Sequence, residues 1–112
     1  MELRTEVSDI EGWTVVTVHG EIDVATSPSL RERLIGLVSD VSARLVLDLE
    51  AVDFLDSTGL GTIVSVLKRA RTHGGDLRLV CTEARIRRLF EITGLDKAVQ
   101  LHASLDDAIS AR

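Results

Sequence analysis

Apolar residues follow two different spacings along this chain. Near the N-terminus, residues 2–7 alternate between polar and apolar, and residues 13–19 are rich in β-branched side chains. Both patterns are typical of β-strands. The segment Asp9–Gly12 between them has the composition of a turn. The pattern therefore predicts a β-hairpin at the start of the chain.

Beyond the hairpin, helical spacing of three to four residues alternates with short apolar runs. Pro28 is expected at the first position of a helix capped by Ser27 or Thr26, with an apolar stripe that extends to Val41. The later elements are predicted as a strand over 45–49, a helix over 57–72, a strand over 76–81, a helix from a Thr82 cap to Gly94, a strand over 98–102 and a short helix capped by Ser104. This order predicts an α/β fold with a mixed, mostly parallel sheet of about five strands and about four helices.

The composition narrows the choice of function. The 112 residues fit one domain, 1–112, and 45% of them are hydrophobic, which is enough for one packed core. The net charge of −5 and an aromatic content of 3% argue against nucleic acid as a direct partner. The lone Cys81 fits a reducing compartment, and no segment has the apolar length of a membrane span. The charged start Met1–Arg4 lacks the apolar core of a signal peptide, so we expect a cytoplasmic protein.

The most distinctive stretch of the chain is the segment 53–61. An apolar strand, Leu45–Leu49, leads toward it and the amphipathic helix leads away from it. Ser57 is therefore expected at a strand-to-helix junction, where a hydroxyl is exposed beside free backbone N–H groups. It acts either as a plain helix cap or, in addition, as an acceptor of phosphate. A phosphate is tolerated at the positive end of a helix, but it adds negative charge beside Asp53 and Asp56.

Three other chemistries fit this segment less well. Gly59-Leu60-Gly61 begins like a dinucleotide-binding fingerprint, but Val64 stands where the third glycine belongs. The segment 55–59 resembles the nucleophile elbow of serine hydrolases, but Leu55 replaces its first glycine and no histidine is placed beside Ser57. Asp53 and Asp56 fit a solvated acidic loop better than a metal pair, since a hard cation needs more oxygen ligands. We therefore predict no enzyme activity, no cofactor and no metal.

Three pieces of the sequence together resemble a known family. These pieces are Gly20-Glu21-Ile22-Asp23, the strand Leu45–Leu49 and the segment Phe54–Gly61. They resemble the anti-sigma factor antagonists, which are bacterial single-domain STAS proteins, and the resemblance covers nearly the whole chain. In that family the serine after the aspartate is phosphorylated, and that residue here is Ser57.

The resemblance also implies roles for the neighbouring residues. It implies that the Asp23 loop lies beside Ser57 and contributes to recognition by the kinase, and that Asp56 and Thr58 flank the acceptor. Gly59 and Gly61 would shape the start of the helix. The predicted partner-binding residues are Asp23, Asp53, Asp56, Ser57, Thr58, Gly59, Leu60 and Gly61.

The function implied by the resemblance is a partner switch. When Ser57 is unmodified, the domain would bind an anti-sigma factor that is also a serine kinase, and so free a sigma factor. Phosphorylation of Ser57 would release the partner, and a serine phosphatase would reset the switch. We expect a monomer or a weak dimer. The alternative is a STAS subunit of a transporter or a stress-signalling scaffold, in which Ser57 is only a cap and is not phosphorylated.

Overall fold

A computed structural model describes residues 2–111 of the chain. It holds five strands, four α-helices and one 3₁₀ turn. In chain order they are β1 (Leu3–Ile10), β2 (Trp13–Ile22), α1 (Ser27–Val38), β3 (Arg44–Leu55), α2 (Ser57–Thr72), β4 (Asp76–Val80), α3 (Ala84–Thr93), η1 (Leu95–Lys97), β5 (Leu101–His102) and α4 (Leu105–Ser110). The predicted α/β fold, with its N-terminal hairpin, is confirmed.

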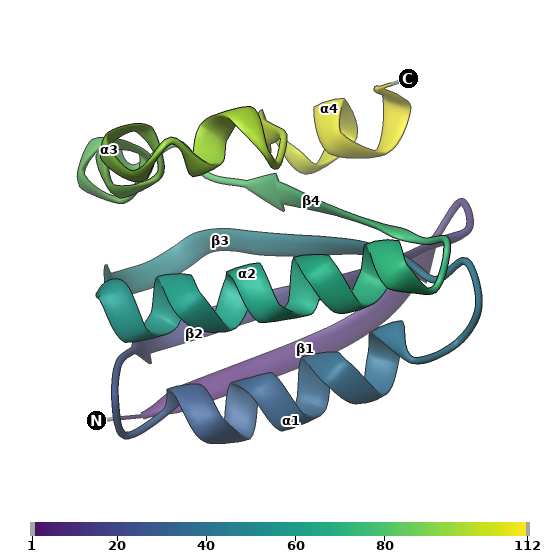
Figure 1. Ribbon diagram of the computed structural model, residues 1–112. Coiled ribbons are helices and arrows are strands. Elements are labelled where there is room, and N and C mark those ends of the chain that lie inside the picture. The colour runs from purple at the N-terminus through teal and green to yellow at the C-terminus, as the bar shows by residue number, and fades with distance from the viewer. Residues whose placement is uncertain (1, 112) are drawn as a thin grey trace.

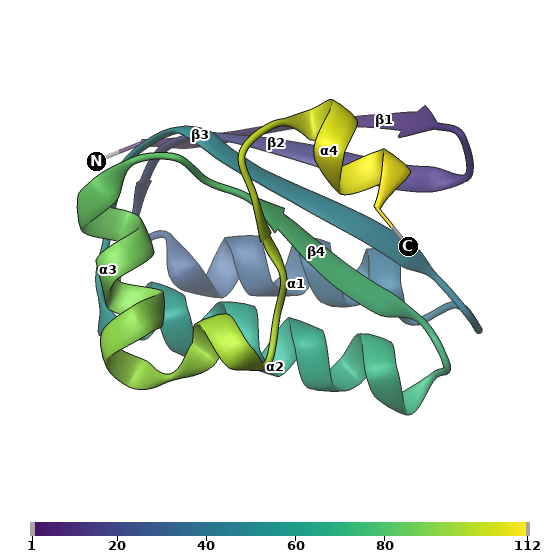
Figure 2. The ribbon, with the colours of Figure 1, turned by 90° about the horizontal axis from the view of Figure 1, so that it is seen from above.

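The five strands form one sheet in the order of the chain, β1-β2-β3-β4-β5. β1 and β2 are antiparallel, and every later pair is parallel. Helices α1 and α2 lie side by side on one face of this sheet, as Figure 1 shows. Figure 2 places α4 on the opposite face, so the sheet is the middle layer of the molecule. None of the helices in residues 2–111 combines the length and the apolarity needed to cross a bilayer.

The main core lies between the sheet and the helix pair α1 and α2. It is built from Val, Leu and Ile side chains, as the low aromatic content predicts, and Phe90 of α3 is its one large aromatic residue. A smaller cluster around Trp13 fills the other face under α4. There the guanidinium groups of Arg44 and Arg78 each lie 4.3 Å from the centroid of the Trp13 ring. These cation–π contacts place charged groups over the Trp13 ring at the edge of the smaller cluster.

All five strands differ in their bounds from the prediction. β1 and β2 each continue three residues beyond their predicted ends, to Ile10 and Ile22, and β4 ends one residue earlier, at Val80. The central strand runs to Leu55 rather than Leu49, because its parallel pairing with β2 continues as far as the pair Ile22 and Leu55. The last strand begins at Leu101 rather than Ala98. The backbone N–H groups of Ala98 and Val99 both donate to the carbonyl of Leu95, so these residues close the η1 turn instead of joining the sheet.

Two predictions about α1 are wrong. The helix begins at Ser27, so Pro28 is its second residue, and Thr26 holds the cap position without a side-chain hydrogen bond to the helix. The Thr26 hydroxyl is used in the preceding loop, where it donates to the carbonyl of Glu21. The helix ends at Val38, which leaves Val41 in a loop with 81% of its surface exposed.

The cap of α3 is also one residue away from its predicted position. Glu83, not Thr82, caps the helix, because its carboxylate accepts hydrogen bonds from the backbone N–H groups of Arg85 and Ile86. Thr82 instead donates its N–H and its hydroxyl to the carboxylate of Glu50. These bonds tie the segment just before α3 to the middle of β3. The predicted Ser104 cap of α4 is confirmed, since its hydroxyl accepts from Asp107 N–H.

Candidate functional site

The strand-to-helix turn at Ser57 is a single residue long. β3 ends at Leu55, α2 begins at Ser57, and only Asp56 lies between them. The Asp56 backbone is extended, and its Oδ1 accepts a hydrogen bond of 3.0 Å from the N–H of Gly59. Asp56 is therefore the helix cap, and the interpretation of Ser57 as the cap is wrong. The cap is the residue that precedes the first helical turn, and here that turn already includes Ser57.

Ser57 is left with an unused hydroxyl on the surface. Both Ser57 and Thr58 are exposed, and among residues 2–111 the Ser57 hydroxyl makes no hydrogen bond. It sits at the positive end of a 16-residue helix. The first backbone N–H groups of a helix have no partner within the helix, and they favour a negative group at this point. The hydroxyl is therefore free to accept a phosphate without the loss of a bond that holds the fold.

The loop that contains Asp23 lies directly beside this turn. Ile22 and Leu55 are paired at the ends of β2 and β3, and Asp56 N–H donates to the Ile22 carbonyl at 3.3 Å. The two segments thus leave the sheet side by side. This placement agrees with the neighbourhood that the sequence resemblance implies for Asp23.

Asp23 does not present its carboxylate to solvent. The residue is 7% exposed, and its Oδ1 accepts hydrogen bonds from the N–H groups of Ala25 and Thr26 at 2.9 and 3.0 Å. Its own N–H donates to the Thr26 hydroxyl. The residue that the loop exposes is Val24, at 70%. Asp23 therefore shapes the loop, and a partner that docks here meets Val24.

The residues before the turn extend the exposed surface toward α3. Asp53 is exposed, and the ring of Phe54 is 44% exposed. Both residues line an open cleft of about 200 Å³, whose other wall is formed by residues of α3 that include Arg85 and Leu89. An exposed aromatic ring beside a cleft is typical of a protein-docking surface.

The predicted site residues in the first turn of α2 fall into two groups. Leu60 is 5% exposed and packs in the main core, so it is not a surface contact. Gly59 is also buried, and a Cβ at this position would lie 2.5 Å from Leu55 Cδ1 and 2.6 Å from Ile22 Cγ2. Gly61 is exposed, and a Cβ there would meet nothing within 4 Å. The fold thus requires glycine at position 59 but not at position 61.

The three histidines of the chain lie in other contacts than the Ser57 turn. His73 lies beyond the far end of α2, where its Nδ1 is 2.9 Å from the Arg69 carbonyl. His19 lies 2.8 Å from Glu6 on the hairpin. His102 is in β5, where burial and the nearby charge of Arg78 lower its pKa. Within residues 2–111 no group of three or more His, Cys, Asp or Glu side chains is arranged to hold a metal ion.

Sequence reasoning missed two parts of this surface. Val24 and Phe54 were not among the predicted contacts, although each is an apolar residue next to a predicted site residue. Their position next to predicted site residues was the available signal. Whether their side chains are exposed, however, depends on how the ends of β2 and β3 lie in the folded chain. The position of the α3 wall beside segment 53–61 could not be predicted, because its residues are about 30 positions away in the sequence.

Comparison with known proteins gives one family. The STAS domain model matches residues 4–108. The Anti-sigma-B factor antagonist of Bacillus subtilis (strain 168) is 37% identical over 109 residues, which are 97% of this chain and 99% of the relative. The Anti-sigma-B factor antagonist of Staphylococcus aureus (strain NCTC 8325 / PS 47) is 40% identical over 95 residues, 85% of this chain and 88% of the relative.

A solved structure agrees with these sequence matches. The crystal structure of an anti-sigma factor antagonist from Mycobacterium paratuberculosis superposes with a TM-score of 0.90 at 38% identity. The match covers 98% of this chain and 93% of that one. The strand order and the helix placement described above are thus those of a solved relative.

Proposed function

The chain belongs to the STAS domain family and, within it, to the anti-sigma factor antagonists, and from this premise we propose that it is a phosphorylation-controlled partner switch. Unmodified, it binds an anti-sigma factor with serine kinase activity, and this binding frees a sigma factor. The kinase then transfers the γ-phosphoryl group of ATP to Ser57 Oγ, and the complex comes apart. A serine phosphatase removes the phosphate and restores binding. This cycle places the protein in the cytoplasm.

The observation that carries the proposal is the unused Ser57 hydroxyl within an exposed apolar surface. Val24, at 70% exposure, and Phe54, at 44%, lie on the two segments that flank the turn. Apolar side chains of this kind supply binding energy when a partner covers them. The hydroxyl is therefore placed where a docked partner would enclose it. We define the docking surface as Val24, Asp53, Phe54, Ser57, Thr58 and Gly61.

Phosphorylation changes the charge of this surface without any change in the core. A phosphate adds about 1.5–2 negative charges. Against one carboxylate of the partner at about 6 Å, that charge costs about 1–5 kcal/mol for effective dielectric constants between 80 and 20. The loss in affinity is roughly fivefold to a few thousandfold. Asp53, which is exposed four residues before Ser57, adds to the negative field.

The phosphate does not need to unfold the turn to act. Its oxygens would face the free N–H groups at the start of α2, which stabilise a negative group. The Asp56 cap keeps its own bond to Gly59 N–H, because that bond does not involve Ser57. The fold should therefore survive the modification, and only the partner should be affected.

The experiment uses Ser57→Ala as bait and as control. This variant lacks the acceptor oxygen, so it should bind the kinase and not be released by ATP. The anti-sigma factor captured in this way from cells of the source organism is then purified and mixed with wild type and ATP. We expect one phosphate on wild type and none on Ser57→Ala, measured by intact mass and peptide mapping.

Thr58→Ala is the matched control, since Thr58 is an exposed hydroxyl residue in the same turn. It should accept one phosphate, as wild type does. Equal phosphate on Ser57→Ala and wild type would reject Ser57 as the acceptor. Binding without any phosphate transfer would favour the alternative of a docking module on a transporter or a scaffold, in which Ser57 is never modified.

A further inference from the structure

The sheet has one long free edge, which is strand β1. The strand order places β1 and β5 at the two edges, and β5 is only two residues long. β1 is eight residues long, contains no proline, and pairs with β2 without a bulge from Leu3 to Ile10. An edge of this length without a bulge is open to pairing with another strand.

The pairing with β2 decides which backbone groups point outward. Across the two-residue turn at Glu11 and Gly12, Ile10 and Trp13 lie opposite each other as a hydrogen-bonded pair. At the other end of the strand, Glu21 N–H donates to the Glu2 carbonyl. In an antiparallel ladder alternate residues bond to the same neighbour. The even-numbered residues of β1 therefore bond to β2, and Leu3, Thr5 and Val7 turn their N–H and C=O groups to the free edge.

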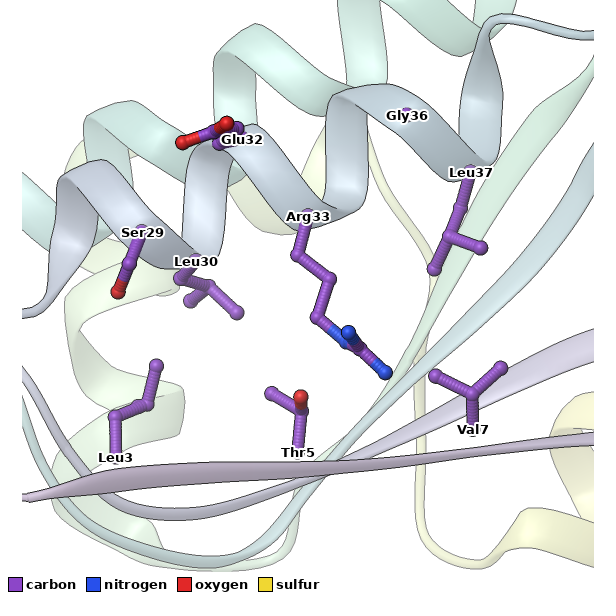
Figure 3. A pocket seen from close by; sticks show the side chains of 9 residues that line it. All are labelled: Leu3, Thr5, Val7, Ser29, Leu30, Glu32, Arg33, Gly36 and Leu37. Atoms are coloured by element: carbon purple, nitrogen blue, oxygen red, sulfur yellow. The ribbon is translucent and has the colours of Figure 1, made fainter.

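The side chains of these outward-bonding residues line an open groove under α1. Figure 3 shows Leu3, Thr5 and Val7 pointing from β1 toward Leu30, Arg33 and Leu37 of α1. The groove has a volume of about 720 Å³, and Val7 is 40% exposed. The apolar face of β1 is thus only partly covered by its own helix.

Gly36 lies in the wall of this groove, and packing within residues 2–111 does not require a glycine there. It is exposed in the interior of α1, and a Cβ there would meet nothing within 4 Å. Glycine inside a helix is destabilising relative to alanine. Glycine at this position weakens the helix, and the fold does not need it. The lack of a side chain would, however, let another molecule approach α1 closely from the open side of the groove.

We propose that β1 pairs with β1 of a second copy of this chain, antiparallel, about a two-fold axis that passes through Thr5. In this register Arg4 lies opposite Glu6 of the second copy, on the face away from α1, and Leu3 lies opposite Val7 on the groove face. Each of these pairs occurs twice, and all four are of the kind that stabilises a sheet. The side chains of Arg4 and Glu6 are 72% and 64% exposed. Within one chain Glu6 lies 2.8 Å from His19 and 3.9 Å from Arg4, so in the dimer its exposed carboxylate would be shared with Arg4 of the second copy.

The charges also select this register over its neighbours. An axis through Glu6 would place Glu6 opposite Glu6, and an axis through Arg4 would place Arg4 opposite Arg4. Like charges directly opposite one another destabilise a sheet. Of these three axes, only the one through Thr5 places opposite charges together, and it does so while Leu3 and Val7 also pair.

This dimer goes beyond the partner switch and leaves it intact. Ser57 follows β3, which lies two strands inward from the β1 edge. The pairing would join two five-stranded sheets into one and leave both docking surfaces exposed. The assembled protein would therefore present two Ser57 switches to its partners.

Disulfide trapping tests the register. Thr5 lies on the axis, so Thr5→Cys should form a disulfide-linked dimer under mild oxidation. Val7→Cys is the matched control, on the same strand and the same face. Two Val7 positions would lie four residues apart along the strands, about 13 Å, which is too far for a disulfide. The native Cys81 does not interfere, because it is buried. Faster linkage of Val7→Cys than of Thr5→Cys would overturn the register.

Charge exchange tests the contact in solution by sedimentation over a wide range of concentration. Wild type should show a dimer that dissociates on dilution. Arg4→Glu alone should weaken the dimer about tenfold or more, and adding Glu6→Arg should restore it. Circular dichroism checks that each variant is folded. A wild type that stays monomeric at millimolar concentration would overturn the proposal. The remaining possibility would then be that β1 pairs with a segment of a different protein. A double variant as weak as Arg4→Glu would overturn it too.

Discussion

Separate alanine substitutions at Gly59 and Gly61 in α2 distinguish a glycine that the fold requires from one that only the docking surface requires. In Gly59→Ala the new Cβ would lie 2.5 Å from Leu55 Cδ1, 2.6 Å from Ile22 Cγ2 and 3.0 Å from the Ile22 carbonyl oxygen. Ile22 is fully buried, and its branched side chain is stiff at the first torsion. Overpacking of this kind costs about 1–3 kcal/mol. The better helix propensity of alanine offsets at most about 1 kcal/mol of it.

The same change at Gly61 should have the opposite effect on stability. A Cβ there meets nothing within 4 Å, so only the helix propensity changes, and it favours alanine by about 0.8–1 kcal/mol. Gly61 is exposed and belongs to the docking surface defined above, however, where an added methyl group would hinder the close approach of a partner. We therefore expect Gly61→Ala to be more stable than wild type and to bind the anti-sigma factor about tenfold more weakly.

The two variants are compared by urea denaturation, followed by circular dichroism, and by titration calorimetry with the anti-sigma factor. Gly59→Ala should lower the free energy of unfolding by about 1 kcal/mol, the middle of the net range of about 0–2 kcal/mol. Gly61→Ala should raise that free energy while its dissociation constant increases. A Gly61→Ala variant that binds as tightly as wild type would refute the close approach at this residue. A Gly59→Ala variant as stable as wild type would refute the packing argument.

Three further predictions concern groups around the sheet. Asp56→Ala removes the acceptor for Gly59 N–H and should lower the free energy of unfolding by about 1 kcal/mol in urea, whereas Asp56→Asn keeps an acceptor and should lose less. Burial, and then the charge of Arg78, lower the pKa of His102 in the folded chain. The unfolded chain therefore binds the proton more readily, and stability should fall as the pH drops below 6.5; His102→Gln should flatten that fall in urea titrations. Burial raises the pKa of Cys81 to about 11 from 9.0, so its thiol should react slowly with a disulfide reagent at neutral pH, and stability should decline as the pH rises from 9.0 toward 11. A fast reaction in the folded protein would contradict this.

The sequence predicts the elements whose pattern is local. The bounds of α2, Ser57–Thr72, follow from its amphipathic spacing and from the glycines after His73, and the structure has the same bounds. The hairpin follows from strand alternation on both sides of one short turn. Such signals depend on neighbours in the chain, so they can be read from the chain alone.

The parts that escaped prediction depend on contacts between distant segments. β3 continues past Leu49 because β2 pairs with it through Leu55, and the polar residues Glu50 and Asp53 hide that pairing in the sequence. Two helix caps moved by one residue, to Asp56 one position earlier in α2 and to Glu83 one position later in α3, because a neighbouring carboxylate reached the free N–H groups. Asp23 was expected to face the partner, but its carboxylate is bound by its own loop.

Our account rests on an exposed hydroxyl at Ser57 whose esterification repels a docked partner. The most direct test measures the affinity of the anti-sigma factor for the unmodified protein and for the protein phosphorylated at Ser57, in the same buffer and with the site verified by peptide mapping. We predict that the dissociation constant rises by at least about fivefold while the fold, followed by circular dichroism, is unchanged. Equal affinity of the two forms, or a phosphate located at a residue other than Ser57, would contradict the account.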